Sequence, residues 1–191
     1  MLSTSTASPD APSPSPTRWQ RLRATWWGRW GIDLLVLAII FWAITSFQTR
    51  DLIERDTPAP PATLINLADG SELKLDDLQA DRTLIYFWAT WCGVCKAQSS
   101  VISAMHRHAE GRDDVDVISV VMDWSDRESL RAFVAENDID YPVYLGTDAL
   151  GKGFNVSSYP TIYVVDNERR VRHSIIGYTP RIGLYARLHL L

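Results

Sequence analysis

The stretch TLIYFWATWCGVCK, residues 83–96, contains both cysteines of the 191-residue chain and decides the expected fold. Residues 83–89 are apolar or aromatic almost without a break, which is typical of a central strand buried on both faces of a sheet. Helical character follows from Cys92 to about Ala109. The two cysteines therefore lie at the junction of a buried strand and a helix.

Strand-like and helical segments alternate after this junction. Residues 115–121 have the composition of a strand, and Ser125 followed by Glu128 resembles a capping box that opens a helix. Strand, helix, strand, helix predicts parallel pairing in an α/β domain. The other expected elements are a hairpin around Asp69-Gly70 (63–67 and 72–75), a short extended piece (141–145), an antiparallel pair (161–165 and 171–176) and a terminal helix from about Pro180.

The N-terminal third has a different character. Residues 1–17 are mostly Ser, Thr, Ala and Pro, so we expect 1–30 to be a disordered cytoplasmic tail with a basic flank. The apolar segment 31–47 predicts a transmembrane signal anchor over 31–48. Four arginines precede it and two follow, which by the positive-inside bias keeps the N-terminus in the cytoplasm. A Pro-rich linker, 49–62, then holds the domain of residues 63–191 off the bilayer.

A buried core helix is the alternative for the apolar segment. Its 17 residues, at about 1.5 Å each, span roughly 25 Å, which is short of a hydrocarbon core about 30 Å thick. The absence of a polar side favours the membrane over a protein core.

Composition excludes several function classes. The hydrophobic fraction of 46% and the aromatic fraction of 10% exclude a wholly disordered chain, and two cysteines are too few for a disulfide scaffold. A net charge of -4 leaves no basic face for a run of phosphates, so we expect no nucleic-acid partner.

The chemistry is concentrated in the cysteine pair. Cys92 and Cys95 are three residues apart on the first turn of the predicted helix, close enough for a disulfide. Unpaired N–H groups and the helix dipole stabilise a thiolate there, so the pKa of Cys92 should fall below the free-thiol value of about 8.5. We expect Cys92 to be the exposed nucleophile and Cys95, one turn deeper, to resolve the mixed disulfide. This redox-active disulfide is the only redox group expected, with no bound cofactor.

Two other roles for the pair are alternatives. A purely structural disulfide is the first, although so small a ring removes little entropy from the unfolded chain. A metal site is the second. The nearest imidazoles, His106 and His108, are two residues apart on a helix and so point in different directions. Four ligands are therefore hard to assemble, and we expect no metal.

The motif FWATWCGVCK, together with Ser158-Tyr159-Pro160-Thr161 before a later strand, resembles the thioredoxin fold. More closely, it resembles the membrane-anchored branch of TlpA-like, ResA-like and suppressor-of-copper-sensitivity D-like proteins. The resemblance covers about residues 63–191. It implies an α/β thioredoxin-like fold with an N-terminal β-hairpin extension and a central strand-helix insertion, preceded by one transmembrane helix.

The resemblance also implies site residues. Pro160 is expected to be cis and to lie against the cysteine pair, where the backbone of Tyr159 can hydrogen-bond a substrate strand. Asp123 and Trp124, which follow the strand 115–121, are added to the site because parallel strands end at one edge of the sheet. The expected substrate-binding residues are Trp91, Gly93, Val94, Tyr159, Thr161, Asp123 and Trp124.

The sequence departs from the family pattern at three places. Tyr86 occupies the position of a buried acid six residues before the first cysteine, and Gln98 that of a glutamate three residues after the second. The usual proton acceptors for Cys95 are therefore absent. Pro160 is followed by Thr-Ile, whereas cytochrome c maturation members have Pro-Glu-Thr, which disfavours a haem pathway.

These features predict a thiol:disulfide oxidoreductase of the protein-disulfide reductase type. We expect it in the bacterial inner membrane, single-pass, with a cytoplasmic N-terminus and a periplasmic catalytic domain. Gly93-Val94 places no charge between the cysteines, so weaker thiolate stabilisation predicts a reducing couple. The expected partners are exported proteins with thiols or disulfides and a DsbD-like membrane electron donor. The alternatives are a copper-handling Cys/His binding protein of an envelope stress system, a cytochrome c maturation thioredoxin, and an interaction module without turnover.

Overall fold

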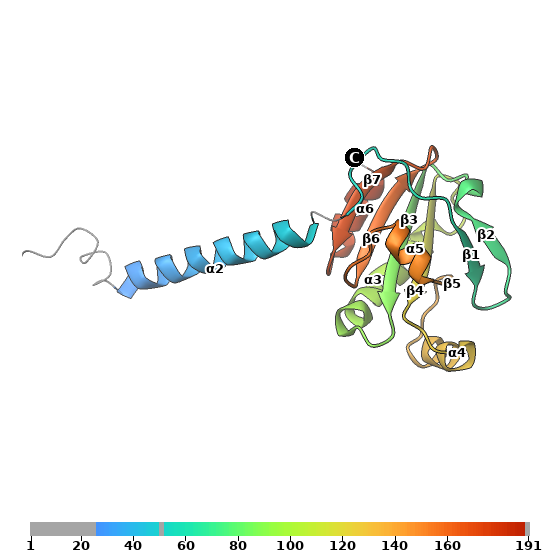
Figure 1. Ribbon diagram of the computed structural model, residues 1–191, viewed down its shortest axis with the longest axis horizontal. Helices are drawn as coiled ribbons and strands as arrows, with labels where there is room; N and C mark the ends of the chain where they lie inside the picture. Colours follow the sequence, from blue (N-terminus) through green and yellow to red (C-terminus); the bar gives the residue numbers. More distant parts are fainter. Residues whose placement is uncertain (1–25, 50–51, 190–191) are drawn as a thin grey trace, which may run out of the picture. The chain divides into compact units, whose positions relative to one another are not determined.

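The computed structural model describes residues 26–49 and 52–189, with side chains described over 31–43 and 52–189. The chain divides into two units, residues 1–46 and 47–191. The described part of the first unit lies in helix α2 (Trp26–Thr49), whose last three residues belong to the second unit (Figure 1). Its large apolar side chains between Leu34 and Trp42 are exposed. Most of the predicted tail 1–30 lies outside the described residues.

By length and apolar content, no helix within the residues that the structure describes qualifies as a membrane span. The anchor expected over 31–48 therefore stays a prediction.

A seven-stranded sheet forms the centre of the second unit, in the order β2-β1-β5-β4-β3-β6-β7 (Figure 1). Strand β3 is parallel to β4, and β4 to β5, as the alternation of strands and helices predicts. The pairs β1–β2, β1–β5, β3–β6 and β6–β7 are antiparallel. The strands are β1 (Thr63–Asn66), β2 (Glu72–Lys74), β3 (Arg82–Ala89), β4 (Val115–Met122), β5 (Val143–Leu145), β6 (Thr161–Asp166) and β7 (Val171–Ile176).

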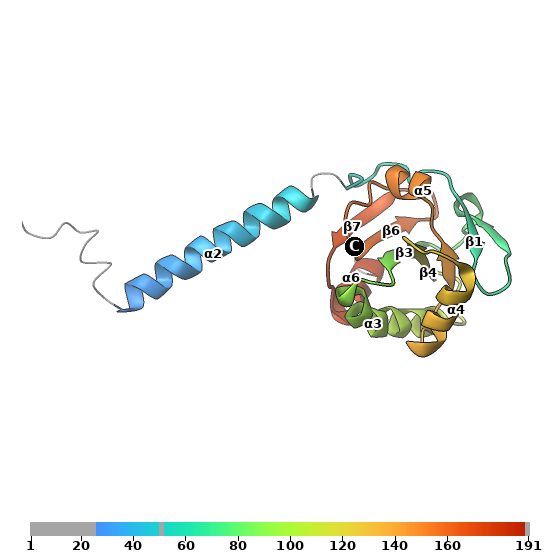
Figure 2. The same cartoon turned by 60° about the horizontal axis from the view of Figure 1, so that its bottom comes forward.

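Helices cover both faces of this sheet. On one face lie α3 (Gly93–Ala109), α4 (Arg127–Glu136) and α6 (Arg181–His189), which share a core containing Ile102, Leu130 and Leu184. On the other lie the short helix α5 (Asp148–Gly153) and the 3-10 turn η1 (Leu75–Asp77). Figure 2 shows α5 and α3 on opposite sides of the sheet. Every residue of β3 except Arg82 is buried, which confirms the prediction of a strand covered on both faces.

The segment predicted as a spacer is part of the folded unit from residue 52. Leu52 and Ala59 are buried in the core on the α5 side of the sheet. The N–H of Asp56 donates to the carbonyl of Val171 at 2.8 Å, and its carboxylate pairs with Arg172. These bonds hold residues 52–62 along β7, so the segment does not extend away from the folded unit. The domain boundary predicted at residue 63 therefore lies inside the unit of residues 47–191.

Two local details also differ from the predictions. The N-cap of α4 is Asp126, whose carboxylate accepts the N–H of Ser129 at 2.8 Å, whereas the capping box placed the cap at Ser125. The hydroxyl of Ser125 instead donates to the Asp126 carboxylate. Helix α5 was not expected, because its six residues are too few to show a hydrophobic period.

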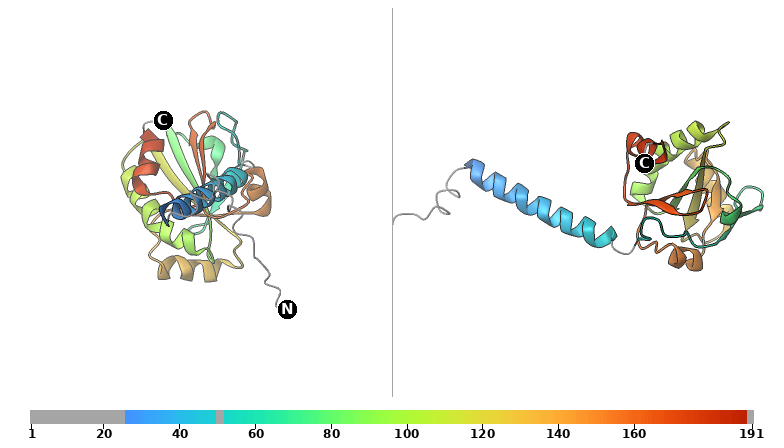
Figure 3. Two further views of the ribbon diagram at one scale, coloured as in Figure 1. Left: turned by 90° about the vertical axis from the view of Figure 1, so that its left-hand side faces the viewer. Right: turned by 90° about the horizontal axis from the view of Figure 1, so that it is seen from above.

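An imidazole pair joins the last helix to α3. The Nε2 atoms of His108 and His189 are 3.0 Å apart, and the Tyr185 ring packs against both imidazoles. Figure 3 shows α6 beside α3. A hydrogen bond between two imidazoles needs one of them neutral as the acceptor, so protonation of both breaks this contact.

The stability of the fold should therefore depend on pH through His189. Burial, with the nearby His108 and Arg112, lowers the pKa of His189 from 6.5. Because the unfolded chain binds this proton more tightly, the stabilisation is complete above about pH 6.5 and is lost as pH falls through the lowered pKa. We expect the free energy of unfolding to fall in this range, and His189→Gln to flatten the slope in urea titrations.

Well above about pH 6.5, where His189 is neutral in both the folded and the unfolded chain, the variant and the wild type should follow parallel curves. His173, whose pKa burial also lowers, contributes to the slope in both proteins. Equal slopes below pH 6.5 in the two proteins would contradict this role of His189.

Candidate active site

The structure joins Cys92 and Cys95 in a disulfide at the start of α3, with an S–S distance of 2.06 Å. Cys92 is the N-cap residue of this helix, and its Sγ accepts a hydrogen bond from the N–H of Cys95 at 3.1 Å. An N–H group at a helix N-terminus favours negative charge on the atom that accepts from it. The geometry therefore suits Cys92, and not Cys95, to be the thiolate of the reduced pair.

The exposure of Cys92 differs from the expectation. Its relative exposure is 5% and that of Cys95 is 2%, so the expected exposed nucleophile is nearly covered in the disulfide form. Its neighbours Trp91 (66%) and Val94 (48%) carry the exposed surface instead, and Gly93 is exposed between them. The difference has a physical reason, because the sulfur is turned toward the Cys95 sulfur and N–H. Trp91 and Val94 thus form an exposed apolar rim next to Cys92.

The proline loop ends at the same site. The Tyr159–Pro160 peptide bond is cis, as the resemblance implies, and Pro160 is buried with its carbonyl bonded to the N–H of Gly177 at 2.8 Å. Thr161 is fully buried, and its hydroxyl donates to the carbonyl of Ser158 at 2.7 Å. The Thr161 side chain thus holds the loop in shape.

A polar and aromatic cluster links this loop to the cysteine motif. The indole Nε1–H of Trp91 donates to Oδ2 of Asp123 at 2.7 Å, and the Trp91 ring meets the Tyr159 ring edge-on with centroids 5.8 Å apart. Asp123 adopts a left-handed backbone conformation (φ 54) directly after β4. Burial, with a smaller contribution from the Asp123 carboxylate, raises the pKa of Tyr159. Three of the expected site residues are thus brought together by contacts.

Trp124 is placed elsewhere. Its Nε1–H donates to the carbonyl of Gly146 at 2.9 Å, and its ring packs against the core under α4. It lines a depression of about 200 Å³ with residues of α4 and its cap. Of the two residues that follow β4, Asp123 therefore contacts the cysteine motif and Trp124 supports the neighbouring loop.

The two positions without an acid form hydrogen bonds inside the protein. Tyr86 is fully buried, its hydroxyl donates to the carbonyl of Cys95 at 3.1 Å, and burial raises its pKa far above the ordinary 10.0. Gln98 is also fully buried and pairs twice with the backbone of Thr179. Its Oε1 accepts the N–H at 2.8 Å and its Nε2 donates to the carbonyl at 3.0 Å. Both side chains position α3, and neither is a base.

The histidines do not approach the disulfide through any described contact. His106 lies 4.0 Å from Glu110, and His108 faces His189. Within residues 26–49 and 52–189, no group of three or more His, Cys, Asp or Glu side chains is arranged to hold a metal ion.

Sequence reasoning missed several residues around the site. Tyr178 is 54% exposed and follows Gly177, which is bonded to Pro160, so it extends the apolar rim. Ser99 and Tyr141 share a hydrogen bond of 2.9 Å on the far side of Cys95. The sequence pointed to Ser99 only through its position four residues after Cys95 on a predicted helix, which puts the two side chains on the same face. Nothing in the sequence pointed to Tyr141.

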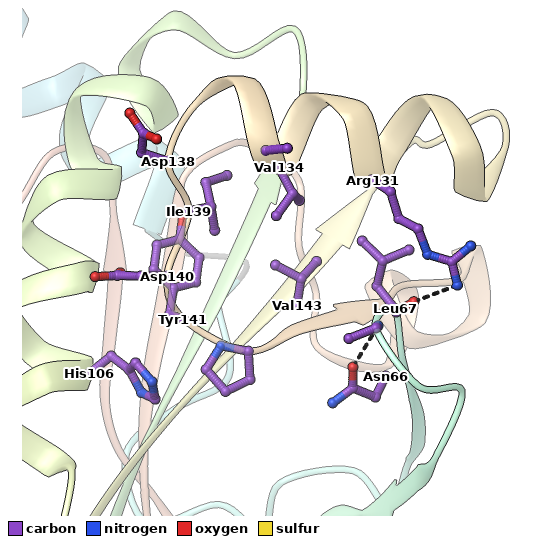
Figure 4. A pocket seen from close by; sticks show the side chains of 13 residues that line it. Asn66, Leu67, His106, Arg131, Val134, Asp138, Ile139, Asp140, Tyr141 and Val143 are labelled. Carbon is purple, nitrogen blue, oxygen red and sulfur yellow. Dashed lines mark hydrogen bonds between the residues drawn. The ribbon is translucent and has the colours of Figure 1, made fainter.

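An open groove with a volume of about 960 Å³ is lined by the start of β5, the end of β1, α4 and His106 (Figure 4). Arg131 spans one side by donating to the carbonyl of Leu67 at 3.0 Å. The cysteines are not among its lining residues. Tyr141, however, lines both this groove and a smaller cavity that reaches Cys95.

Comparison with known proteins agrees with this geometry. A family model described as the AhpC/TSA family matches residues 56–174, which is more than half of the chain. The chain belongs to the AhpC/TSA family. Thioredoxin-like protein YneN of Bacillus subtilis is 23% identical over 82% of this chain and 94% of its own length. Thiol-disulfide oxidoreductase ResA of the same organism is 25% identical over 78% of this chain and 83% of its own.

Solved structures show the fold of this AhpC/TSA member. A putative thiol:disulfide interchange protein DsbE from Chlorobium tepidum superposes with a TM-score of 0.62 at 20% identity, over 71% of this chain and 99% of that one. A DsbF homologue from Corynebacterium diphtheriae gives a TM-score of 0.63 at 20% identity, over 72% and 88% of the two chains. The predicted thioredoxin-like α/β fold and the family resemblance are confirmed.

Gln98 provides a test of how the site treats a buried acid. In Gln98→Glu, a carboxylate can accept the Thr179 N–H but faces the Thr179 carbonyl, so it must be protonated to keep both bonds. The pKa of the new carboxyl is then raised. Its contribution to stability is complete below the ordinary value of about 4.3 and is lost as pH rises through the raised pKa. We expect the variant to lose about 1–3 kcal/mol near pH 8 and much less near pH 5, in urea unfolding.

Gln79→Glu is the matched control, because Gln79 also donates to a backbone carbonyl, that of Asp77, but is exposed. Its stability should change little with pH relative to the wild type. A Gln98→Glu protein that is as stable near pH 8 as near pH 5 would show that the carboxylate finds another partner.

Proposed function

We propose that this protein is a thiol:disulfide oxidoreductase that exchanges disulfides with other proteins through Cys92 and Cys95. One observation carries the proposal: the sulfur of Cys92 accepts the N–H of Cys95 at the N-terminus of α3, in a motif whose Trp91 packs against Tyr159 of the cis-proline loop. The name of the ResA relative, a thiol-disulfide oxidoreductase, supports the same class of reaction.

The reaction follows from the order of the two sulfurs. In the reduced protein, the Cys92 thiolate attacks a substrate disulfide, forms a mixed disulfide and releases one substrate thiolate. Cys95 then loses its proton and attacks the sulfur of Cys92, which releases the second substrate thiolate. Each substrate thiolate takes up one proton, so the substrate gains two electrons and two protons, and the protein is left with the Cys92–Cys95 disulfide.

The surroundings of Cys92 favour an extended polypeptide as substrate. Trp91, Val94 and Tyr159 supply apolar and aromatic contacts around the sulfur. No hydrogen bond within the described part of the chain uses the N–H or carbonyl of Tyr159. These two groups are therefore free to pair with the backbone of a substrate strand. Asp123 is a positioning residue, since it fixes the Trp91 indole and does not reach the sulfurs itself.

The proposed direction is reduction of the partner. The residues between the cysteines, Gly93 and Val94, provide neither charge nor a side-chain donor to the thiolate, in contrast to strong oxidants. A reductase must itself be re-reduced after each turnover. We propose that a DsbD-like membrane protein supplies these electrons, and that the substrates are cysteines of exported proteins.

The proposed location is the periplasmic side of the bacterial inner membrane. Support comes from the apolar run 31–47 and from the arginine bias around it. The exposed apolar side chains from Leu34 to Trp42 follow one another without interruption by a charge, so they lie all round α2. Residues 31–48 would anchor the chain with its N-terminus in the cytoplasm.

Membrane anchoring is tested by expressing the full chain in bacteria. The protein should stay in the membrane fraction after a carbonate wash, and protease added to spheroplasts should remove the domain of residues 47–191. Replacing two apolar residues near the centre of the segment, Leu37 and Ile40, by Asp should release it, because each charge costs roughly 2.5–3.5 kcal/mol at the membrane centre. Release of the wild type by the wash would contradict the anchor.

Disulfide exchange is tested by reduction of insulin with dithiothreitol as electron source. We expect Cys92→Ser to abolish the catalysed reduction, because the remaining sulfur, that of Cys95, is 2% exposed and is not the N-cap sulfur that accepts an amide N–H. Ser100→Ala, an exposed position on the same helix, is the control and should keep the wild-type rate. Tight Cu(I) binding without any exchange would contradict the proposal and favour a copper-handling protein.

The direction is tested by the equilibrium of the pair with glutathione. We expect a potential closer to the value of thioredoxin, about -270 mV, than to that of DsbA, about -120 mV. A potential near the latter value would make the protein an oxidant. Cys95→Ser lacks the resolving sulfur, so it should accumulate mixed disulfides with natural partners, and these complexes would identify substrate and donor.

A further inference from the structure

Resolution of the mixed disulfide requires that Cys95 give up its proton in the interior of the protein. This question rests on the proposed function. Cys95 is 2% exposed, and Tyr86 and Gln98, which stand where the family pattern has an acid, are neutral and engaged in structural hydrogen bonds. No carboxylate lines the space beside it. The proton must therefore leave by another route.

A cavity of about 60 Å³ lies beside Cys95, between α3, α4 and the end of β3. Its volume exceeds the share of one water molecule in the liquid, about 30 Å³. An apolar cavity of this size stays dry, whereas one with several polar groups binds water. The residues that line it are Trp88, Ala89, Cys95, Lys96, Ser99, Phe133, Asn137, Ile139 and Tyr141.

The lining provides the polar groups that a water needs. Ser99 Oγ and Tyr141 Oη lie 2.9 Å apart, and the Tyr141 residue is 4% exposed. The indole Nε1–H of Trp88, a residue that is 3% exposed, has no hydrogen-bond partner in the described part of the chain. A buried donor without a partner is unfavourable, and a bound water that accepts its hydrogen would remove that penalty. The residues that line the cavity thus carry an unpartnered donor, two hydroxyls and the sulfur of Cys95.

Tyr141 connects this cavity to the solvent. Together with Ile139 it also lines the open groove of about 960 Å³, as Figure 4 shows for both side chains. The two spaces therefore share one wall, and Tyr141, whose hydroxyl is hydrogen-bonded to that of Ser99, is part of it. A proton passed to the hydroxyl pair from the inside can be released to groove water on the outside.

The charges around the cavity favour this movement. Lys96 is the single charged residue among those that line it, and its Nζ lies 5.3 Å from the centroid of the Phe133 ring. A cationic residue in the wall of a cavity favours a thiolate inside it over a thiol. Helix α4 contributes only neutral groups, and Asp140 beside Tyr141 is paired with Arg107. On β3, Tyr86 donates to the Cys95 carbonyl.

We propose that water bound in this cavity and the Ser99–Tyr141 hydroxyl pair form the proton path for Cys95. The thiol gives its proton to the cavity water, the water passes a proton to the hydroxyl pair, and the pair releases one to the groove. The Cys95 thiolate then attacks Cys92 Sγ, the bond from Cys92 to the substrate breaks, and the substrate leaves as a thiolate. Burial raises the pKa of Tyr141 to about 12, so its phenol stays protonated and acts as a carrier. Ser99 and Tyr141 are positioning residues, since they act through the water.

The two sulfurs can be followed separately with Ellman's reagent, 5,5′-dithiobis(2-nitrobenzoate). In stopped flow with the reduced full-length protein, attack by Cys92 releases the first nitrothiobenzoate, and attack by Cys95 on the mixed disulfide releases the second. We expect Tyr141→Phe and Ser99→Ala to slow the second release at pH 7 by at least about tenfold. This lower bound is smaller than the rate enhancement that a general acid or base usually contributes. We also expect the midpoint of its pH profile to rise and its solvent isotope effect to change, while the first release is unaffected.

Tyr163→Phe is the matched control. Tyr163 is as fully buried as Tyr86, and its hydroxyl donates to the carbonyl of Phe154 at 2.5 Å on the opposite face of the sheet. It should lower stability without changing the pH profile of either release. Ser99→Ala places a good helix former at a half-buried helical position, so it keeps the test valid if Tyr141→Phe folds poorly.

The outcomes separate this inference from the proposed function. A normal first release with an unchanged second release and pH midpoint in both variants would overturn the proton path and leave the oxidoreductase intact. Loss of the first release in the wild type would instead overturn the oxidoreductase itself. A magnetisation-transfer signal from water to the Trp88 indole proton, absent in Trp88→Phe, is the expected direct sign of the bound water, and no transfer to that proton would contradict it.

Discussion

The N–H of Cys95, directed at the sulfur of Cys92, is the interaction on which the site depends. It exists because Cys92 is the last residue before α3, so the first turn of the helix presents its unpaired amides to that sulfur. The position of this first helical turn is fixed by β3, which is buried on both faces and leads directly into the cysteine motif. A shift of one residue in β3 would exchange the side chains of its two faces, so packing holds the helix start in place.

Strand register brings the other parts of the site to the same edge. Ala89, the last residue of β3, pairs with Met122 in the parallel strand β4, so Asp123 leaves the sheet beside the cysteine motif. Phe87 pairs with Thr161 in the antiparallel strand β6, so Pro160 enters the sheet at that edge as well. Strands β3 and β4 end where β6 begins, and three segments far apart in the sequence therefore meet around one sulfur. Mixed parallel and antiparallel pairing is the reason that two loops of opposite direction share the site.

The strands around the site could be predicted because their signals are local and strong. The apolar run 83–89 and the segment 115–121 identified β3 and β4, and parallel pairing placed Asp123 correctly next to the motif. The cis bond before Pro160 came from the resemblance, since no local pattern distinguishes it. These features depend on composition or on a motif that spans few residues.

The remaining features depend on tertiary contacts that no local pattern records. The packing of residues 52–62 along β7 uses backbone hydrogen bonds and the pairing of Asp56 with Arg172, which are distant in sequence. The prolines of that segment suggested a spacer because composition reports stiffness and says nothing about what the segment contacts. The low exposure of Cys92 has the same origin, as it reflects the disulfide and its neighbours in space.

The neutral character of the interior around Cys95 follows from a balance between folding and chemistry. A buried carboxylate can serve as a proton acceptor, but burial of an ionised group without a charged partner is costly. Tyr86 and Gln98 occupy positions where their hydrogen bonds to Cys95 and Thr179 tie β3, α3 and the loop before α6 together. Each would lose a donor if it were replaced by an ionised acid. The fold gains rigidity at these two positions. Removal of the proton from Cys95 must then depend on neutral groups, namely hydroxyls and water.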